Sequence, residues 1–387
     1  MTVRRTAAAV VVLAGGWVLI EVVRAWEYLG GPFGLLGSTQ WSNLPMLSAA
    51  AIGGVWLVGY IAVGVNVAVV AALAGGSSRL PAIGAAVLLL AIGPLYHLLA
   101  PRPEGERTVR VAVVQPGVTT GAEVRFDLGE SLTSNAVGNG VDLVVWGESS
   151  VGFDLQERPD LRSRLEELAA SSGAQILVNV DARSTRGGIY KSSVLVSAEG
   201  IEDRYDKMRL VPFGEYIPLR PALGWVTGLT EAAREDRSRG RSPALFSSAG
   251  FDFGPLVCFE SAFPDLTRTL ALMGAEMIIV QSATSTFQES WAPETHAGLA
   301  AVRAVETGRP VLHSTLTGVS AAFDARGERH LWLGTDRTGV RIAAFPLATR
   351  RTPYLRLGDW VLYLSLATVV GAAAFAWRRA RVSGEPL

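Results

Sequence analysis

Charged residues divide the chain into apolar segments near its two ends and an ordinarily charged middle. No Asp, Glu, Lys or Arg occurs in residues 44–77 or 81–100. A bilayer core requires about 20 predominantly apolar residues in a helix. These two runs, with the apolar segments 7–23 and 360–377, therefore predict four membrane-spanning helices, three before the charged middle and one after it.

The first apolar segment contains a carboxylate, Glu21. A charged side chain within a membrane needs a partner, and Arg24, one helical turn later, is the candidate. No small-residue cleavage pattern follows the segment and further apolar runs do, so a membrane helix is favoured over a signal peptide.

Four spans place both ends of the chain on the same side of the membrane. The positive-inside rule assigns that side to the cytoplasm and residues 105–356 to the outside. The arginines that favour this orientation are Arg4, Arg5, Arg79, Arg378, Arg379 and Arg381. Those that weigh against it, near the other span ends, are Arg102, Arg107, Arg110, Arg350, Arg351 and Arg356.

The middle of the chain alternates apolar runs with helical patterns. Continuous apolar runs are typical of strands buried on both faces, and helices often close at a glycine. The predicted strands are 109–116, 141–146, 174–180, 192–197, 254–259, 277–282, 310–315 and 318–324. The predicted helices are 161–173, 264–275 and 296–308. This alternation indicates the α/β class, with sheets covered by helices.

Composition narrows the class of protein. The 387 residues include 35 basic and 35 acidic side chains, and 49% are hydrophobic but only 18% charged. Mean hydropathy is +0.30. These values exclude a disordered chain and a strongly basic nucleic-acid binder. A single cysteine excludes an intramolecular disulfide, and the four histidines lie too far apart for a metal-ligand pattern, so no metal is expected.

Glu148 follows an apolar strand in the sequence VDLVVWGESS. Reactive groups of α/β proteins gather at the carboxyl ends of strands. Partial desolvation there is expected to raise the pKa of Glu148 toward that of a useful base. For an isolated glutamate, the alternative of a residue that caps the next segment remains open.

Lys207 lies in the sequence YDKMRLVPFGEY, in a chain whose other lysine is Lys191 and whose remaining cations are arginines. A lysine ammonium can point at one oxyanion, whereas a guanidinium is a planar fork. Glu215, further along the same segment, is a possible ion-pair partner. The alternative is an ordinary surface lysine.

Cys258 ends the strand in GPLVCFES and is followed by Glu260. A lone cysteine is usually a small buried hydrophobic residue. At a strand end near a glutamate and a lysine, its pKa is instead expected to fall, which would make it a nucleophile.

The order Glu148, Lys207, Cys258, each near a strand end, resembles that of the nitrilase, or carbon–nitrogen hydrolase, superfamily. WGES resembles its glutamate motif, YDKMRLVPFGEYIPL its lysine motif and VCFES its cysteine turn. The lysine motif and the flanking membrane segments are closest to one membrane branch, the apolipoprotein N-acyltransferases. The resemblance covers residues 16–377.

The resemblance implies an α-β-β-α sandwich on the outer face of the bacterial cytoplasmic membrane, in a multi-pass protein. Cys258 would take an acyl chain from a phospholipid as a thioester and pass it to the α-amino group of a diacylglyceryl-cysteine on a lipoprotein. Glu148 would be the general base and Lys207 would stabilise the oxyanion. No cofactor, metal or nucleic acid is implied, and a monomer is expected. The supporting residues would be Trp146, Glu215, Tyr216, Phe259 and Glu260.

The predicted domains follow the apolar segments. They are the membrane helices at 1–100, a linker at 101–108, the nitrilase-like domain at 109–356, a last membrane helix at 357–378 and a cytoplasmic tail at 379–387. Within the nitrilase-like domain, the apolar run 216–229 would suit a loop that dips into a lipid surface.

The chain departs from the family pattern at several positions. The family usually has more N-terminal spans. It often has Pro where this chain has Gly147, Tyr at Phe259, Asn at Lys191 and Leu316, and amides at Ala283 and Thr284. These departures leave open the choice of donor and acceptor, and whether the site is active.

Two alternatives to an acyltransferase remain. One is a membrane-anchored hydrolase, an amidase or thioesterase that passes the acyl group to water. The other is a catalytically silent protein that binds lipoproteins, against which the complete Glu–Lys–Cys set argues. A transporter or channel is disfavoured because the spans carry few polar residues apart from Glu21 and His97.

Overall fold

The computed structural model describes residues 3–101, 107–135, 140–183, 187–228 and 235–383. The chain forms two compact units, one of residues 1–26, 34–102 and 351–387, the other of residues 27–33 and 103–350. The predicted linker at 101–108 and the predicted tail at 379–387 lie partly outside the described residues.

The first unit is helical. Its long helices are α1 (Val3–Arg24), α3 (Ala50–Leu73), α4 (Arg79–Leu99) and α11 (Trp360–Ser383). Its shorter pieces are η2 (Leu36–Gln40), α2 (Leu44–Leu47), η3 (Gly76–Ser78) and α10 (Pro353–Leu357). Among the described residues, the four long helices α1, α3, α4 and α11 are those long and apolar enough to cross a membrane, as the sequence predicts.

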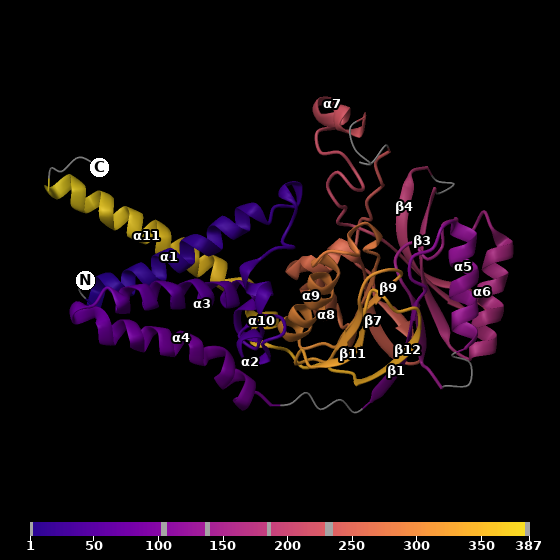
Figure 1. The fold of residues 1–387 in the computed structure, drawn as a ribbon, viewed down its shortest axis with the longest axis horizontal. Helices are drawn as coiled ribbons and strands as arrows, with labels where there is room; N and C mark the ends of the chain where they lie inside the picture. Colours follow the sequence, from indigo (N-terminus) through magenta and orange to yellow (C-terminus); the bar gives the residue numbers. More distant parts are fainter. Residues whose placement is uncertain (1–2, 102–106, 136–139, 184–186, 229–234, 384–387) are drawn as a thin grey trace. The chain divides into compact units, whose positions relative to one another are not determined.

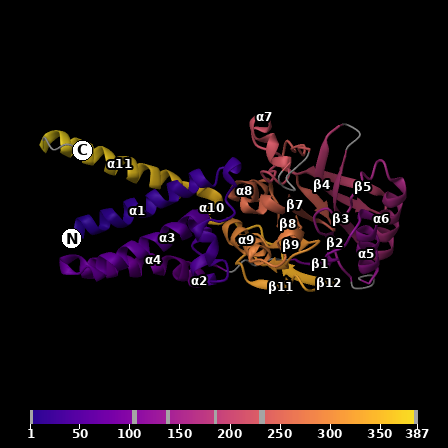
Figure 2. The ribbon, with the colours of Figure 1, turned by 45° about the horizontal axis from the view of Figure 1, so that its top comes forward.

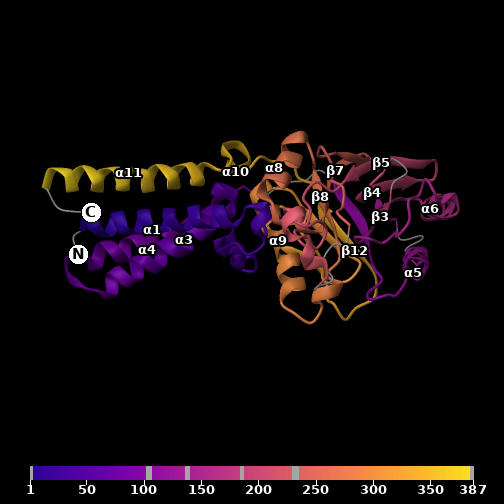
Figure 3. The same ribbon diagram turned by 90° about the horizontal axis from the view of Figure 1, so that it is seen from above.

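Helix α1 packs against α3 and α11, and α3 packs against α4 (Figure 3). The first turn of α1, the last turn of α11 and the turn that joins α3 to α4 all lie at the same end of this helix group (Figure 2). Four candidate spans arranged in this way would place both ends of the chain on one side of a membrane, which is the topology that the sequence predicts.

Small residues allow these helices to approach closely. A Cβ on Gly15 of α1 would lie 3.3 Å from the Cα of Ser365 in α11, and one on Gly64 of α3 would lie 2.8 Å from the Leu89 side chain in α4. Residues Gly53 and Gly54 break the helical backbone inside α3, so the uncharged run 44–77 is not one straight span.

Glu21 is buried in this helical unit. Its carboxylate accepts a hydrogen bond from Arg24, the predicted partner, at 3.2 Å and one from the backbone N–H of Leu36 at 2.7 Å. Its Oε2 lies 3.3 Å from the position that a Cβ on Gly59 would occupy. The carboxylate is therefore paired inside the protein, as a charge within an apolar segment must be.

The second unit is a sandwich of two sheets. Within the described residues each sheet has six strands. The first sheet runs in the order β12 (Gly339–Pro346), β1 (Thr108–Gln115), β2 (Leu143–Trp146), β3 (Gln175–Arg183), β4 (Ile189–Ser197), β5 (Gly200–Asp206). The second runs β11 (Arg329–Leu333), β10 (Ser320–Phe323), β9 (Val311–Thr315), β8 (Met277–Ser282), β7 (Phe251–Val257), β6 (Phe246–Ser248).

The central strands of each sheet are parallel. β1, β2 and β3 run the same way, as do β7, β8 and β9, whereas the outer pairs are antiparallel. The carboxyl ends of parallel strands meet at one edge of a sheet, and ligands bind there in α/β proteins. This edge of both sheets carries the residues that the sequence singles out.

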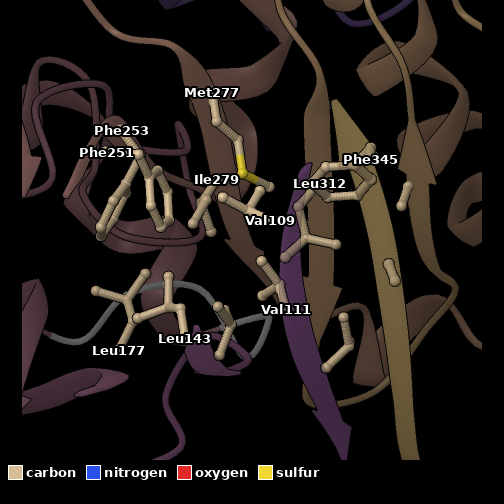
Figure 4. Packing of buried hydrophobic residues seen from close by; sticks show 14 of the residues in the cluster. Val109, Val111, Leu143, Leu177, Phe251, Phe253, Met277, Ile279, Leu312 and Phe345 are labelled. Atoms are coloured by element: carbon tan, nitrogen blue, oxygen red, sulfur yellow. The ribbon is translucent and has the colours of Figure 1, made fainter. Parts of the chain in front are cut away.

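The core lies between the sheets. Val109, Leu143 and Leu177 of the first sheet meet Phe253 and Ile279 of the second (Figure 4). Each such side chain, fully buried, contributes roughly 1.5–3 kcal/mol relative to exposure. This packing sets the distance between the two strand edges that carry the site.

Helices cover the outer faces of both sheets. Helices α5 (Ala122–Ser134) and α6 (Pro159–Ser172) cover the first sheet, and α8 (Pro264–Met273) and α9 (Ala292–Thr307) cover the second (Figure 1). The shorter helices of this unit are η1 (Glu27–Leu29), α7 (Arg220–Leu223), η4 (Gly224–Gly228), η5 (Cys258–Ala262) and η6 (Ser285–Phe287). The layers α-β-β-α confirm the predicted fold class.

Candidate active site

Cys258, the single cysteine of the chain, begins the turn η5 directly after β7. Its φ of +52° is in the left-handed region, which costs of order 1–3 kcal/mol for a residue with a side chain and is concentrated at functional sites. The strand therefore ends at Val257 rather than at residue 259 as predicted, and the thiol lies at the strand end.

Glu260 is a buried carboxylate that holds this turn in place. It accepts hydrogen bonds from the N–H of Val257 (2.8 Å), the N–H of Met208 (2.7 Å), the N–H of Arg209 (3.0 Å) and the hydroxyl of Tyr205 (2.7 Å). Burial raises the pKa of Glu260. Because Met208 and Arg209 directly follow Lys207, Glu260 fixes Lys207 relative to Cys258.

Glu148 lies two residues beyond β2, at the edge where the two sheets meet. Its backbone N–H donates to the carbonyl of Ser282, the last residue of β8 in the other sheet, at 3.0 Å. A Cβ on Gly147 would lie 1.9 Å from the backbone nitrogen of Leu316. The absence of a side chain at Gly147 therefore lets the segment after β9 pack against the backbone next to Glu148.

Lys207 follows β5 and is completely buried. Its Nζ lies 2.9 Å from Oε1 of Glu215 and 3.4 Å from Oε1 of Glu148. The predicted pairing of Lys207 with Glu215 is confirmed. The other oxygen of Glu215 accepts the N–H of Val211 at 2.8 Å, which fixes the carboxylate.

The second lysine of the chain, Lys191 of β4, also reaches Glu148. Its Nζ is 3.1 Å from Oε1 of Glu148 and 3.2 Å from Oδ2 of Asp181 in β3. The sequence marks Lys191 only as a departure from the family pattern. The antiparallel pairing of β3 with β4, which places residue 191 directly opposite residue 181, brings it to the site.

The charges around Glu148 reverse two predictions about acidity. Burial on its own would raise the pKa of Glu148, but the charges of Lys191 and Lys207, with hydrogen bonds from Cys258 and Lys191, hold it well below its usual range. The predicted rise of the Glu148 pKa is wrong because two lysines flank this one carboxylate.

The acidity of Cys258 also differs from the prediction. Burial and the negative charge of Glu148 raise the pKa of Cys258 to about 12, and Lys207 offsets only part of this rise. The predicted fall of the thiol pKa is therefore wrong too.

The resting site thus holds an ionised carboxylate beside a neutral thiol. Such a pair can act as general base and nucleophile by exchanging one proton during attack. A lysine ammonium has three N–H groups, and for Lys207 the acceptors among the described residues are Glu215 and Glu148. The remaining donor can serve a negative oxygen that develops on a substrate.

The supporting residues predicted from the sequence occupy different places. Phe259 is buried and packs edge to face on Phe263 at 5.0 Å. The Tyr216 ring lies under the guanidinium of Arg239 at 4.9 Å. Both lie outside the group of charges formed by Glu148, Lys191, Lys207 and Glu215.

Trp146 does not reach the site, contrary to the prediction. Its indole N–H donates to Thr133 of α5 at 2.8 Å, and its ring packs on Phe126. Successive residues of a strand face opposite sides of the sheet. Val145 faces the other sheet, so Trp146 faces the covering helix.

His296 of α9 lies at the site but has no motif that predicts it. Its Nε2 is 3.1 Å from the carbonyl oxygen of Cys258 and 3.1 Å from Oγ of Ser261, and its Nδ1 is 3.3 Å from Oγ of Ser282. Burial lowers the pKa of His296, which keeps the ring neutral. Within the described part of the chain, no group of three or more His, Cys, Asp or Glu is arranged to hold a metal ion.

Backbone groups occupy the region where the family pattern has amides. The N–H of Leu316 donates to the carbonyl of Ser282 at 2.9 Å, and the N–H of Thr284 donates to the carbonyl of Thr317 at 2.9 Å. The segments after β8 and β9 are therefore joined through main-chain atoms, and the hydroxyl of Thr284 adds a hydrogen bond to the carbonyl of Thr317 at 3.2 Å.

The sequence matches two family models. Residues 110–353 match the carbon–nitrogen hydrolase family, and residues 1–68 match the N-terminal domain of apolipoprotein N-acyltransferase. The first of these matches covers the whole sandwich except for residues near its ends.

Curated relatives are similar along nearly the whole chain. The apolipoprotein N-acyltransferase of Geobacter metallireducens is 30% identical over 94% of this chain and 73% of its own length. That of Methylococcus capsulatus is 30% identical over 97% of this chain and 75% of its own.

Solved structures agree with the fold of the sandwich. An amidase from Nesterenkonia sp. superimposes with a TM-score of 0.50 at 20% identity, over 68% of this chain and 97% of the amidase. Identity at this level supports the fold alone.

Proposed function

The chain belongs to the apolipoprotein N-acyltransferases, within the carbon–nitrogen hydrolase family, and on that premise we propose that it moves an acyl chain from a phospholipid to the N-terminal amine of a diacylglyceryl-modified lipoprotein. The observation that carries the proposal is the meeting of Glu148, Lys207 and Cys258, which come from strand ends of two sheets. All three belong to one chain, so a monomer suffices.

In the first half-reaction the sulfur of Cys258 attacks the ester carbonyl of the phospholipid while Glu148 takes the thiol proton. Lys207 stabilises the tetrahedral oxyanion, and Glu215 holds its ammonium in place. The ester C–O bond then breaks, the leaving alkoxide takes the proton back from Glu148, and an acyl thioester remains on Cys258.

In the second half-reaction the lipoprotein amine attacks the thioester. Glu148 takes a proton from the attacking nitrogen, the C–S bond breaks, and the thiolate of Cys258 regains the proton. Each residue returns to its starting state, so the side chains named here suffice for the cycle. If water replaced the amine, the same steps would make the protein a hydrolase.

A membrane location supports lipids as substrates. The helices α1, α3, α4 and α11 are candidate spans, and the arginines at the shared end of this helix group favour a cytoplasmic location for that end under the positive-inside rule. The sandwich, encoded between the third and fourth spans, would then face outward as a domain of a multi-pass protein.

A protruding segment of the sandwich fits contact with lipid. Helix α7 stands away from the sheets (Figure 1). Leu219, directly before α7, is 76% exposed, and Trp225 in the following turn η4 is 65% exposed. Large apolar residues at an exposed tip favour insertion into the headgroup region. Residue 229, the last of the apolar run predicted to dip into lipid, lies outside the described residues.

The proposal predicts a covalent acyl adduct on Cys258. Intact mass spectrometry of the protein in phospholipid micelles should show an added acyl mass that a diacylglyceryl-cysteine peptide removes. Cys258→Ala should carry no adduct. Lys207→Met and Glu148→Gln should form it at least ~100-fold more slowly, because each removes a group that acts only as the tetrahedral intermediate forms.

The outcomes separate the alternatives. An adduct lost at the same rate with and without the peptide would indicate a hydrolase. An adduct on Cys258→Ala would place the nucleophile elsewhere. If the wild-type protein acquired no adduct from any phospholipid while remaining folded, it would be a silent homologue.

A further inference from the structure

Lys191 is a buried lysine at the centre of the site that the proposed acyl transfer does not use. Its side chain is 12% exposed. Besides Glu148 and Asp181, its ammonium contacts Oγ of Ser149 at 2.9 Å and lies 3.9 Å from Oε1 of Glu215. It approaches the same oxygen of Glu148 as Lys207 does, and more closely, at 3.1 Å against 3.4 Å.

The balance of charge shows what Lys191 provides. The carboxylates of Glu148 and Glu215 are only 5% and 8% exposed, and both lie next to Lys207. Without Lys191, two buried carboxylates would share one ammonium. Carboxylates that share too little positive charge cannot both remain ionised, so one of them takes up a proton.

We propose that Lys191 is a positioning residue that keeps Glu148 ionised and turned toward Cys258, and thereby sets the lowest pH at which the protein forms its acyl-enzyme. The inference rests on the proposed role of Glu148 as the base. It assigns to Lys191 a function separate from that of Lys207. Lys207 stabilises the oxyanion, and Lys191 keeps the general base Glu148 ionised.

The other charged groups near Glu148 come from several elements. Lys207, after β5, and Cys258, after β7, contact it directly. Glu215 lies beyond the lysines, and His296 of α9 is held neutral by burial. On the far side of Lys191, Asp181 of β3 pairs with Arg237 at 2.6 Å. Lys191 thus lies between Glu148 and Asp181, whereas Lys207 lies between Glu148 and Glu215.

The sign of the effect follows from this arrangement. A carboxylate with a lowered pKa stays ionised, and able to accept a proton, down to a lower pH. Removing the charge of Lys191 raises the pKa of Glu148, so the base is lost at a higher pH as the solution is acidified. Raising the pH should restore the reaction, which a merely structural defect would not permit.

The test measures the rate of acyl-enzyme formation from pH 2 to pH 9 by intact mass, with phospholipid micelles as the donor, because the lowered pKa of Glu148 places the acidic limb of the wild-type pH–rate profile near the lower end of this range. In Lys191→Met the acidic limb of the pH–rate profile should move to higher pH by at least about one unit. At a pH on the acidic side of the limb this corresponds to a loss of about tenfold in the rate, whereas the loss at pH 9 should be small. Lys191→Arg retains a positive charge and should keep the limb within about half a unit of wild type.

Asp181→Asn provides a variant of opposite sign. The substitution removes the carboxylate that competes with Glu148 for Lys191. The acidic limb of the pH–rate profile of this variant should therefore stay in place or move to lower pH. This variant also keeps the inference testable if Lys191→Met does not fold, because Asp181→Asn with a limb moved up by a unit would overturn it.

Two further outcomes would reject the role of Lys191. One is a pH–rate profile of Lys191→Met that overlays that of wild type, and the other is a loss of activity by the same factor at every pH. Either result, with wild type and Glu148→Gln behaving as proposed, overturns this inference alone. Failure of wild type to form the thioester would instead reject the proposed function.

Discussion

At residue 147 the backbone leaves no room for a side chain, and this feature controls the position of Glu148. We predict that Gly147→Ala destabilises the protein by about 3 kcal/mol, the upper part of the range for overpacking, because the new Cβ would meet the backbone of Leu316. Acyl-enzyme formation should fall by roughly 100-fold, since a displacement of about 1 Å at a reacting group has that effect. Thermal unfolding and single-turnover kinetics measure the two losses.

Gly84→Ala is the control for this substitution. Residue 84 lies in helix α4, outside the site, and a Cβ there meets nothing within 4 Å. Its stability and kinetics should equal those of wild type. Equal behaviour of the two alanine variants would contradict the role given to Gly147.

At the residue scale, local motifs were enough to find Glu148, Lys207, Glu215 and Cys258. Their acidities were not predictable, because they depend on which charges the fold brings together. Lys191 stands next to Glu148 only through the pairing of β3 with β4. Nothing in the sequence around residue 191 contains that information.

At the scale of elements, the segment Glu27–Phe33 belongs to the compact unit of the sandwich, although it follows the first apolar helix in sequence. Oε2 of Glu27 accepts from Arg209 at 2.7 Å and Oε1 from Arg239 at 2.6 Å. A Cβ on Gly31 would lie 2.6 Å from the ring of Phe259. The segment thus touches both the loop after Lys207 and the turn of Cys258.

Glu27→Gln should therefore weaken the site from a distance. The change leaves two partly exposed arginines without their shared carboxylate, and we expect a loss of about 1–3 kcal/mol in unfolding free energy. Acyl-enzyme formation should slow as the Lys207 loop loosens. Denaturant unfolding of the whole chain in detergent and the acylation rate are the measurements.

Asp265→Asn is the control for Glu27→Gln. Asp265 is also a partner of Arg209, at 2.9 Å, but its side chain is 53% exposed. Exposed ion pairs contribute about 0–1 kcal/mol. A larger loss in Asp265→Asn than in Glu27→Gln would show that the segment does not support the loop.

The strands that the sequence predicts are the continuously apolar ones. β1 to β4 and β7 to β10 each correspond to a predicted run. β5 (GIEDRYD) and β11 (RHLWL) carry polar residues because they are the outer strands of their sheets, and no apolar run marks them. Helix α5 escapes prediction because few of its residues are buried, namely Phe126, Gly129 and Thr133.

At the scale of the whole molecule, the site is divided between the sheets: Glu148, Lys191 and Lys207 come from the first and Cys258 from the second. Loosening of side-chain packing should separate them before the strands themselves are lost. In a urea titration, acyl-enzyme formation should disappear together with near-UV circular dichroism, at a lower urea concentration than amide protection of β1–β3 and β7–β9.

The single cysteine supplies an internal check on this prediction. Labelling of Cys258 by a maleimide should accelerate over the same range of urea in which activity is lost, because the turn η5 opens when the sheets part. Activity that persisted after the near-UV signal had gone would contradict it.

The pairing of β1 with β12 has a consequence for biosynthesis. These strands join residues 108–115 to residues 339–346, so the first sheet acquires its last strand only when nearly all of the sandwich has been translated. A growing chain contains Glu148, Lys207 and Cys258 well before it contains β12. We expect the emerging chain to remain unreactive toward the surrounding lipid until synthesis of the domain is complete, so that the order of translation itself delays the chemistry.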